Sequence, residues 1–262
     1  MEPFAGEGET TKAVFLSDLH LRSMEERNGQ TLLRFLVSLE SLPMPPDVFL
    51  LGDIFDLWVS DHKVFIQRYQ PLIDSLKKIK ARGAHIYYFE GNHDMHLAGF
   101  WQASLGAEVY IGPRSFEVAG RRVRCEHGDE LNREDKSYLR LRAVLRSPAL
   151  QFLAHTLPGF FWDAFGRRWS RHSRQQSAGT GADETGAPKD REDHIRAVIR
   201  AHAERVWEED PFDLIITGHM HVVDEWTFEK SGKKITSINL GSWLQAPRVL
   251  KLSNQGVQWE IL

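Results

Sequence analysis

The sequence of 262 residues is poor in cysteine and has no long apolar run. Cys125 is the only cysteine, which excludes a disulfide within the chain and is typical of proteins in a reducing compartment. No stretch approaches the roughly 18 consecutive apolar residues of a membrane-spanning helix. Residues 1–11 lack the apolar segment that a signal peptide needs. We therefore expect a cytoplasmic protein.

An excess of charge of one sign is also missing. The formal net charge is −3 at pH 7, so the chain as a whole is not a polycation of the kind that binds nucleic acid or membranes. Apolar residues make up 42% of the sequence, an ordinary fraction that supports a full hydrophobic core. The length allows one large domain, or one domain with a sizeable insertion.

The first half of the sequence alternates between apolar strands and amphipathic helices. We expect strands at 12–17, 48–51 and 84–89, where short apolar runs occur. Apolar residues recur at helical spacing in 31–42 and 64–82, between those strands. This order is typical of a βαβ layer with parallel strands and right-handed crossovers.

The second half is typical of strands paired in hairpins. A further apolar strand is expected at 213–217. The expected hairpins pair 115–118 with 121–126, 223–228 with 234–238, and 249–252 with 257–261. Since the last two strands close the chain, we predict an α/β core with two sheets rather than one open sheet.

Residues 133–211 interrupt this core with a mostly helical pattern. We therefore divide the chain into a core, 1–132 and 212–262, and an insertion, 133–211. Within 140–174, seven arginines accompany many large apolar residues, and Asp163 is the only acid. The apolar residues include Leu150, Phe152, Leu153, Leu157, Phe160, Phe161, Trp162, Phe165 and Trp169. Residues 176–189 are rich in Gly, Ala, Ser and Thr and predict a loop.

Five short motifs place polar side chains directly after expected strands. They are Asp18-x-His20, Gly52-Asp53, Gly91-Asn92-His93-Asp94, His127-Gly128-Asp129 and Gly218-His219-x-His221. Ligands of open α/β sheets bind at the carboxyl ends of the strands, so these side chains are expected to share one site. Imidazole, carboxylate and amide groups suit Mn, Fe, Zn, Co or Ni and exclude a thiolate site. One such histidine is more often structural, but the five motifs together predict a metal centre.

The order of these motifs resembles that of the calcineurin-like metallophosphoesterases, across nearly the whole chain. The resemblance implies an α/β/β/α sandwich of two sheets with a helical cap insertion. It also implies two divalent metal ions, with Mn²⁺ as the expected metal and Asp53 as the bridging ligand. Matched motif by motif, one ion would be held by Asp18, His20, Asp53 and His221, and the other by Asp53, Asn92, His127 and His219.

This metal chemistry suits hydrolysis of a phosphoester or a diphosphate. Two cations polarise the phosphoryl oxygens and lower the pKa of a water molecule between them. We expect His93 to donate to the leaving oxygen or to a nonbridging oxygen, with Asp94 orienting its ring. The alternative for His93 is a structural histidine.

Within this superfamily, the chain looks most like the UDP-2,3-diacylglucosamine pyrophosphatases. The chain length, the motif Leu51-Gly52-Asp53-Ile54-Phe55-Asp56-Leu57-Trp58 and the insertion after Asp129 carry this resemblance. It implies cleavage of a UDP-linked diacylglucosamine into UMP and the lipid-bearing sugar 1-phosphate, in lipid A synthesis. The implied substrate contacts are His93, Asp135, Tyr138, Arg168, Arg171 and Ser173. One departure is His93, since those enzymes commonly have arginine at that position.

The insertion favours a lipid substrate independently of the resemblance. Large apolar side chains mixed with arginine fit a cap that shelters acyl chains and contacts the anionic inner-membrane surface. An ordinary helical subdomain is the alternative. The expected partner is a nucleotide-lipid substrate, with no nucleic acid, because the positive charge is concentrated in the insertion. The oligomeric state is left open.

Two other functions fit the same motifs. The first is a phosphodiesterase or phosphatase with another, soluble phosphoester as its substrate. The second is a scaffold of the same fold without activity. A scaffold would be expected to have lost ligands, whereas all seven ligand positions are filled here.

Overall fold

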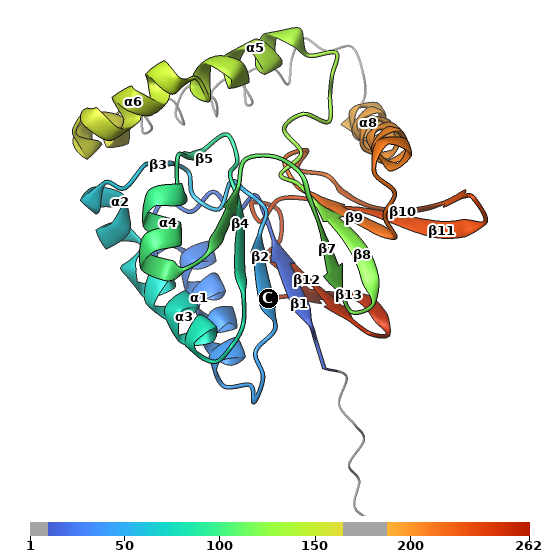
Figure 1. Cartoon of the computed structure of the whole chain (residues 1–262), viewed down its shortest axis with the longest axis horizontal. Helices are drawn as coiled ribbons and strands as arrows, with labels where there is room; N and C mark the ends of the chain where they lie inside the picture. The colour runs from blue at the N-terminus through green and yellow to red at the C-terminus, as the bar shows by residue number, and fades with distance from the viewer. Residues whose placement is uncertain (1–9, 165–187) are drawn as a thin grey trace, which may run out of the picture.

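The structure, a computed structural model, describes residues 10–164 and 188–262. Two β-sheets pack face to face in the middle of the molecule, and helices cover the outer face of each sheet (Figure 1). A pair of helices, α5 and α6, lies across one end of this sandwich (Figure 1). The expected α/β fold with two sheets is confirmed.

The first sheet contains the strands that the βαβ pattern predicted. Its order is β13-β12-β1-β2-β4-β6, and β1, β2, β4 and β6 are parallel. The bounds are β1 Ala13–Leu16, β2 Asp47–Leu50, β4 Ile86–Phe89, β6 Glu108–Tyr110, β12 Arg248–Ser253 and β13 Gly256–Ile261. Parallel pairing brings the carboxyl ends of β1, β2 and β4 to one edge, where three of the motifs follow.

The second sheet has the order β10-β11-β9-β8-β7. Its bounds are β7 Arg114–Val118, β8 Arg121–Cys125, β9 Leu214–Thr217, β10 Val223–Lys230 and β11 Lys233–Leu240. All three predicted hairpins are confirmed, as β7–β8, β10–β11 and β12–β13. The β7–β8 turn has φ of 53° at Ala119 and 72° at Gly120, and two-residue hairpin loops of type I′ require positive φ at both positions.

Helices α1 (Arg27–Glu40), α3 (Gln70–Ala81) and α4 (Ala98–Leu105) belong to the core on the outer face of the first sheet. The prediction of one helix over 64–82 was wrong, because α2 (Lys63–Arg68) ends before α3 begins. Pro71 lies in the first turn of α3, where it has no N–H to continue the hydrogen bonds of α2. Sequence analysis also missed α4, β6 and the short pair β3 (Trp58–Val59) and β5 (Asp94–Met95).

The insertion contributes α5 (Lys136–Leu145), α6 (Pro148–Thr156) and α8 (Pro188–Glu209). Ala203 and Val206 of α8 pack on the outer face of the second sheet with Ile215 of β9. The second half of α8 therefore forms the fourth layer of the sandwich, although the division at 133 and 211 stays a prediction. The predicted loop 176–189 lies outside the described residues, except that its last two residues begin α8.

Alternation along the strands separates two apolar layers. Phe15 of β1 and Phe49 of β2 point between the sheets, and their rings stack with centroids 4.6 Å apart. Their neighbours Val14 and Val48 face the helices instead. Cys125 is also buried between the sheets, and burial raises the pKa of its thiol well above the usual value. The space between the sheets is thus a dry, aromatic-rich core that supports the strand ends.

Phe49→Ala tests this role. Phe49 is fully buried, so the substitution is expected to reduce the free energy of unfolding by about 3–5 kcal/mol in a denaturant titration. Val37→Ala on α1 is the control, because Val37 is half exposed and surface changes usually stay within about 0.5 kcal/mol. A loss at Phe49 no larger than that at Val37 would contradict the assignment.

Candidate metal centre

The seven predicted ligands lie together at one end of the sandwich, on loops from both sheets. The loops after β1, β2 and β4 carry Asp18, Asp53 and Asn92. The loops after β8 and β9 carry His127 and His219. Strand direction therefore brings together side chains that are up to about 200 positions apart in the sequence.

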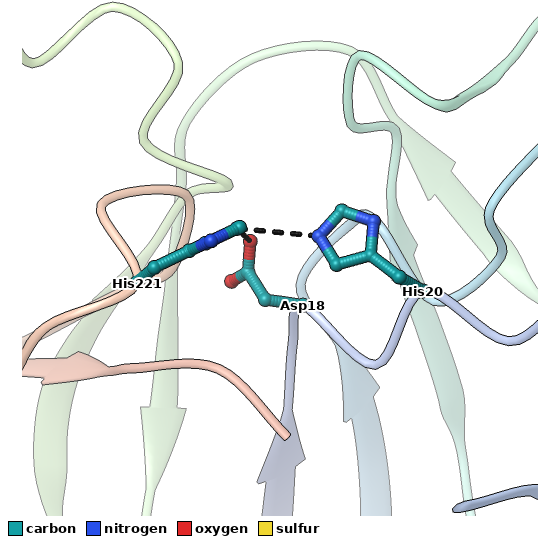
Figure 2. A group of neighbouring side chains, drawn as sticks. All are labelled: Asp18, His20 and His221. Carbon is teal, nitrogen blue, oxygen red and sulfur yellow. Dashed lines mark hydrogen bonds and ion pairs between the residues drawn. The ribbon is translucent and has the colours of Figure 1, made fainter. Parts of the chain in front are cut away.

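Asp18, His20 and His221 form one group of ligand atoms, which all lie within 4.8 Å of one another (Figure 2). His221 Nε2 lies 3.2 Å from Asp18 Oδ1 and 3.2 Å from His20 Nε2. Oδ2 of Asp18 accepts hydrogen bonds from Ser17 Oγ and from the amide of His219. The carboxylate is thus held by one oxygen, while the other faces the two imidazoles.

Asp53, His127 and His219 form a second group at the same mutual spacing. Asn92 Oδ1 lies 3.3 Å from His127 Nε2 and so belongs beside this group. His127 Nδ1 is 2.8 Å from the carbonyl oxygen of Leu51, an acceptor only, so Nδ1 carries the proton. This hydrogen bond directs Nε2 toward the site, where it can bind a metal once it is deprotonated, as metal-binding histidines usually do.

Asp53 lies between the two groups. Its Oδ2 is 3.9 Å from His20 Nε2 in the first group and 3.7 Å from His127 Nε2 in the second. Oδ1 accepts the amide hydrogen of His93 at 2.9 Å, which fixes the orientation of the carboxylate. One oxygen of Asp53 is therefore within reach of both groups.

The ligand residues themselves have unusual backbone geometry. Positive φ values occur at Asp18 (54°), His20 (48°), Asp53 (52°), His219 (67°) and His221 (56°). Each such residue costs on the order of 1–3 kcal/mol, and this kind of strain occurs at functional sites. The neighbouring Gly218 is needed for space, because a Cβ there would lie 2.4 Å from Asp18 Oδ2.

The chemistry of the donors fits divalent cations. Asp18 Oδ1 is buried and lies 3.2 Å from His221 Nε2, an ion-pair contact that does not have hydrogen-bond geometry. A buried carboxylate oxygen needs a compensating partner, and a cation bound here would be one. Burial and the neighbouring His127 lower the pKa of His219 to about 4, so its imidazole is in the neutral, metal-binding form. Burial would raise the pKa of Asp53, but the surrounding histidines, His127 first, lower it instead.

The same charges raise the pKa of His127, whereas they lower that of Asp53. Burial would lower the pKa of His127, but Asp53 and Asp18 raise the pKa to about 9. Two buried carboxylates thus draw a proton to the site, and cation binding would release it because a metal ligand must be deprotonated.

His93 lies at the edge of both groups, as its position beside Asn92 suggested. A ring nitrogen of His93 lies within 4.8 Å of ligand atoms of His20 and Asp53. Nδ1 is 2.9 Å from the carbonyl oxygen of Asp56, so this carbonyl orients the ring and Nε2 remains available. The expectation that Asp94 orients His93 is therefore corrected by the structure.

Asp94 instead connects two of the ligand loops. Its fully buried carboxylate accepts hydrogen bonds from the amides of Asp53, Ile54 and Gly91, and from the hydroxyl of Tyr88 at 2.6 Å. Burial and the nearby charge of Asp53 raise the pKa of Asp94 to about 7. Asp94 therefore positions the two loops, a role that its place next to His93 in the sequence did not indicate.

The predicted substrate contacts are only partly described. Asp135 is the N-cap of α5, and its carboxylate accepts the amide hydrogen of Tyr138 at 2.9 Å. The Tyr138 ring lies 5.5 Å from the His219 ring, so Tyr138 does face the site. Arg168, Arg171 and Ser173 lie outside the described residues. Substrate contact by all of these residues stays a prediction.

Sequence analysis missed two arginines that reach the ligand loops from α5. Arg142 pairs with Asp129, and Arg146 pairs with Glu90. They were counted only as part of the positive charge of the insertion. Their spacing of four residues, which places both on one helix face, was the available signal.

A cavity of about 400 Å³ opens beside this end of the sandwich. Its walls come from the His127–Glu130 loop, from α5 and from α8, and they mix cations with carboxylates. Arg124, Lys136, Glu126 and Asp129 are among the lining residues. Across residues 10–164 and 188–262, the helices fall short of the length and apolarity that crossing a membrane requires.

Comparisons with known proteins agree with this geometry. The calcineurin-like phosphoesterase family model matches residues 11–223. A UDP-2,3-diacylglucosamine hydrolase of Stenotrophomonas maltophilia (strain R551-3) is 29% identical, over 93% of this chain and 95% of that protein. Proteins of the same name from Pseudomonas aeruginosa (strain UCBPP-PA14) and Xanthomonas campestris pv. campestris (strain 8004) are 27% and 26% identical. They cover 93% and 95% of this chain, and 95% and 98% of their own lengths.

The family match spans most of the chain and contains all seven predicted ligand positions, with His221 near its end. The relatives extend the similarity over nearly the whole sequence, the insertion included. The chain therefore belongs to the calcineurin-like phosphoesterase family and is a metallophosphoesterase, a hydrolase of phosphoester or diphosphate bonds.

Proposed function

We propose that the chain hydrolyses the diphosphate of UDP-2,3-diacylglucosamine, releasing UMP and 2,3-diacylglucosamine 1-phosphate. The observation that carries this proposal is an exposed apolar surface on the helices that directly follow the His127–Glu130 loop. Relatives that carry the name of this hydrolase support it at 26–29% identity. The substrate needs both a cationic centre for its diphosphate and an apolar surface for its acyl chains.

Seven of the thirteen exposed large apolar side chains among the described residues lie in the short segment 141–161. They are Leu141, Val144, Phe152, Leu153, Leu157, Phe160 and Phe161. Phe160 and Phe161 stack on each other with centroids 4.5 Å apart, yet remain 65% and 53% exposed. An apolar patch of this kind marks an interaction surface, and each CH₂ of an acyl chain buried there contributes about 0.8 kcal/mol.

The polar part of the substrate would lie at the metal centre. Asp18, His20, Asp53 and His221 are the proposed ligands of one divalent ion, and Asp53, Asn92, His127 and His219 those of the other. When bound, two such ions supply Lewis-acid polarisation of the phosphoryl oxygens and lower the pKa of a water molecule. Mn²⁺ is the proposed metal, and the donor set also suits Fe, Zn, Co and Ni.

Three side chains of the protein have separate roles beside the ions. Asp53 Oδ2 is shared between both sites, while the Asp94 carboxylate holds the Asp53 amide and so fixes the loop. His93, fixed through Nδ1 by the Asp56 carbonyl, presents Nε2 to the leaving oxygen or to a nonbridging oxygen. The cavity beside the His127–Glu130 loop, which has both apolar and charged lining residues, can receive the nucleotide part.

The same surface supports peripheral contact with an anionic membrane. A diacylated substrate resides in a bilayer, and the exposed patch with the exposed Arg140 can approach its headgroups. Arg142 and Arg146 do not add to that attraction, because acids of the core already pair with them. The charge available to a membrane is thus smaller than the composition of the insertion predicts.

One residue favours a second candidate function. His93 occupies a position where the pyrophosphatases that the chain resembles commonly have arginine, so a different, soluble phosphoester is the alternative substrate. The experiment that separates the two is a comparison of kcat/KM for UDP-2,3-diacylglucosamine and UDP-N-acetylglucosamine with Mn²⁺. A preference for the diacylated substrate supports the proposal, and equal values support the alternative.

The cap residues can be tested in the same assay. Phe160→Ser combined with Phe161→Ser is expected to lower kcat/KM for the diacylated substrate by at least tenfold, since an apolar contact for the acyl chains is lost. Activity on a soluble diester such as bis-p-nitrophenyl phosphate is expected to be retained. The matched control is Met44→Ser, which removes an apolar side chain that is 70% exposed outside the cap. Equal loss on both substrates would argue against an acyl-binding role.

Asp53→Ala tests the shared ligand. The variant is expected to lose hydrolysis and both ions, because neither group keeps its full set of donors and the intervening anion is gone. Elemental analysis of protein purified with Mn²⁺ measures the metal per chain directly. Two ions still bound per chain would exclude the bridging assignment.

His93→Ala is expected to lower kcat by roughly 10²–10⁴, the usual contribution of a positioned acid or hydrogen-bond donor. The metal content is expected to stay at the wild-type value, since His93 is not among the proposed ligands. His85→Ala is the control, because His85 is an exposed histidine that precedes the same strand, β4. If kcat stayed within threefold of wild type, His93 would be structural.

A further inference from the structure

Helix α5 is the part of the insertion that contacts the ligand loops most directly. It lies across the end of the sandwich, above the carboxyl ends of the first-sheet strands (Figure 1). Tyr138, Arg142 and Arg146 follow one another at intervals of four residues, which places them on one face of the helix. Each of the three contacts a loop that carries a proposed ligand.

Arg142 holds the loop of His127. Its Nε donates to Asp129 Oδ2 at 2.5 Å, and its Nη1 is 2.7 Å from Glu130 Oε1. Asp129 is buried. The ion pair therefore fixes a buried carboxylate two residues from His127.

Arg146 holds the loop of Asn92. Its Nη1 donates to Glu90 Oε2 at 3.0 Å, and its Nη2 donates to the carbonyl oxygens of Glu90 and Gly91 at 3.2 Å. The other carboxylate oxygen of Glu90 accepts the amide hydrogen of Leu97 at 2.7 Å. The planar guanidinium thus binds both the side chain and the backbone directly before Asn92, which a point charge could not do.

Tyr138 completes the contact at the third loop. Its ring lies 5.5 Å from that of His219, and its hydroxyl lies 3.4 Å from Asp129 Oδ2. One void between α5 and these loops has a volume of about 10 Å³ and is lined by Asn92, Asp129, Tyr138 and both arginines. That space holds about one water molecule, so α5 is packed closely on this side of the loops, whereas the larger cavity opens toward α8.

These contacts lie at one of the two proposed metal sites. They reach the loops of Asn92, His127 and His219, which are proposed to hold one ion. The other ion is proposed to depend on Asp18, His20 and His221, and no hydrogen bond or ion pair joins α5 to those three side chains within the described part of the chain. The insertion therefore touches the two proposed metal sites unequally.

We propose that α5 is a positioning element for the ion of Asn92, His127 and His219, with Arg142 and Arg146 as its positioning residues. This inference rests on the proposed assignment of ligands. Docking of α5 and binding of that ion then favour each other, because each requires the same loop geometry, and such coupling is reciprocal. The insertion, which carries the apolar surface, would thereby act on the metal centre as well as on the substrate.

Stepwise titration of the metal-free protein with Mn²⁺ tests the proposal. Arg142→Gln and Arg146→Gln are each expected to weaken one of the two binding steps at least tenfold while changing the other less than threefold. Arg146→Lys is expected to restore little, since lysine cannot bind both carbonyl oxygens and the carboxylate.

Two controls separate this effect from general loosening of the insertion. Arg140→Gln changes an exposed arginine on the same helix, and it is expected to leave both steps unchanged. Arg68→Gln removes the 2.7 Å ion pair between α2 and Asp163, another contact of insertion and core that lies away from the ligand loops. It is also expected to leave both steps unchanged.

Hydrogen exchange on the unaltered protein gives an independent measurement. Saturating Mn²⁺ is expected to slow amide exchange in α5, residues 136–145, relative to the metal-free protein. The exposed hairpin turn at 119–120 is the internal reference and should not change.

The outcomes distinguish this inference from the function on which it rests. A wild-type chain that binds no Mn²⁺ would overturn the metal assignment itself. Two normal binding steps in the wild type, with both steps unchanged or equally weakened in the arginine variants, would overturn only the role of α5. Amide exchange in α5 that does not change when metal is added to the wild-type protein would also overturn the role of α5.

Discussion

The arrangement of this protein depends on one buried carboxylate, Asp53, which lies between two groups of imidazoles. Burying ionised carboxylates costs several kcal/mol each unless cations or hydrogen bonds compensate them. Here the site concentrates Asp18 and Asp53 among histidines, and the charges shift the pKa of His127 upward and that of Asp53 downward. The same carboxylates that draw a proton to His127 without metal are what a pair of divalent cations requires. Affinity for metal and the raised pKa of His127 therefore have one origin.

The sandwich supplies the rigidity that this arrangement needs. Ligand residues with left-handed backbone conformations persist only where their surroundings determine them, and here they follow strands whose apolar side chains are fully buried. Asp94 adds to this by joining the loops after β2 and β4 through three backbone amides. Its raised pKa, about 7, reflects how completely it has been removed from water. Hydrogen bonding rather than proton transfer accounts for its position.

The exposed apolar residues of the insertion form the proposed surface for substrate, and its arginines contact the loops of the candidate metal centre. Its apolar residues face outward along 141–161, whereas Arg142 and Arg146 point to the core and pair with Asp129 and Glu90. Composition alone could not separate these roles, since both kinds of residue contribute to the same aromatic and arginine-rich stretch. In a chain of the calcineurin-like phosphoesterase family, this division gives a physical route by which a cap can influence the metals below it.

Local pattern in the sequence determined the strands, the three hairpins and the five motifs, because apolar alternation and turn residues act over a few neighbouring positions. The seven proposed ligands could be named in advance, because the motifs after the strands resemble those of the calcineurin-like metallophosphoesterases. Tertiary structure decided what depends on distant segments. It oriented His93 through Asp56 rather than Asp94, and it placed α8 on the second sheet. Those outcomes depend on contacts between segments that are far apart in the sequence. The periodicity of apolar residues carries no information about such contacts.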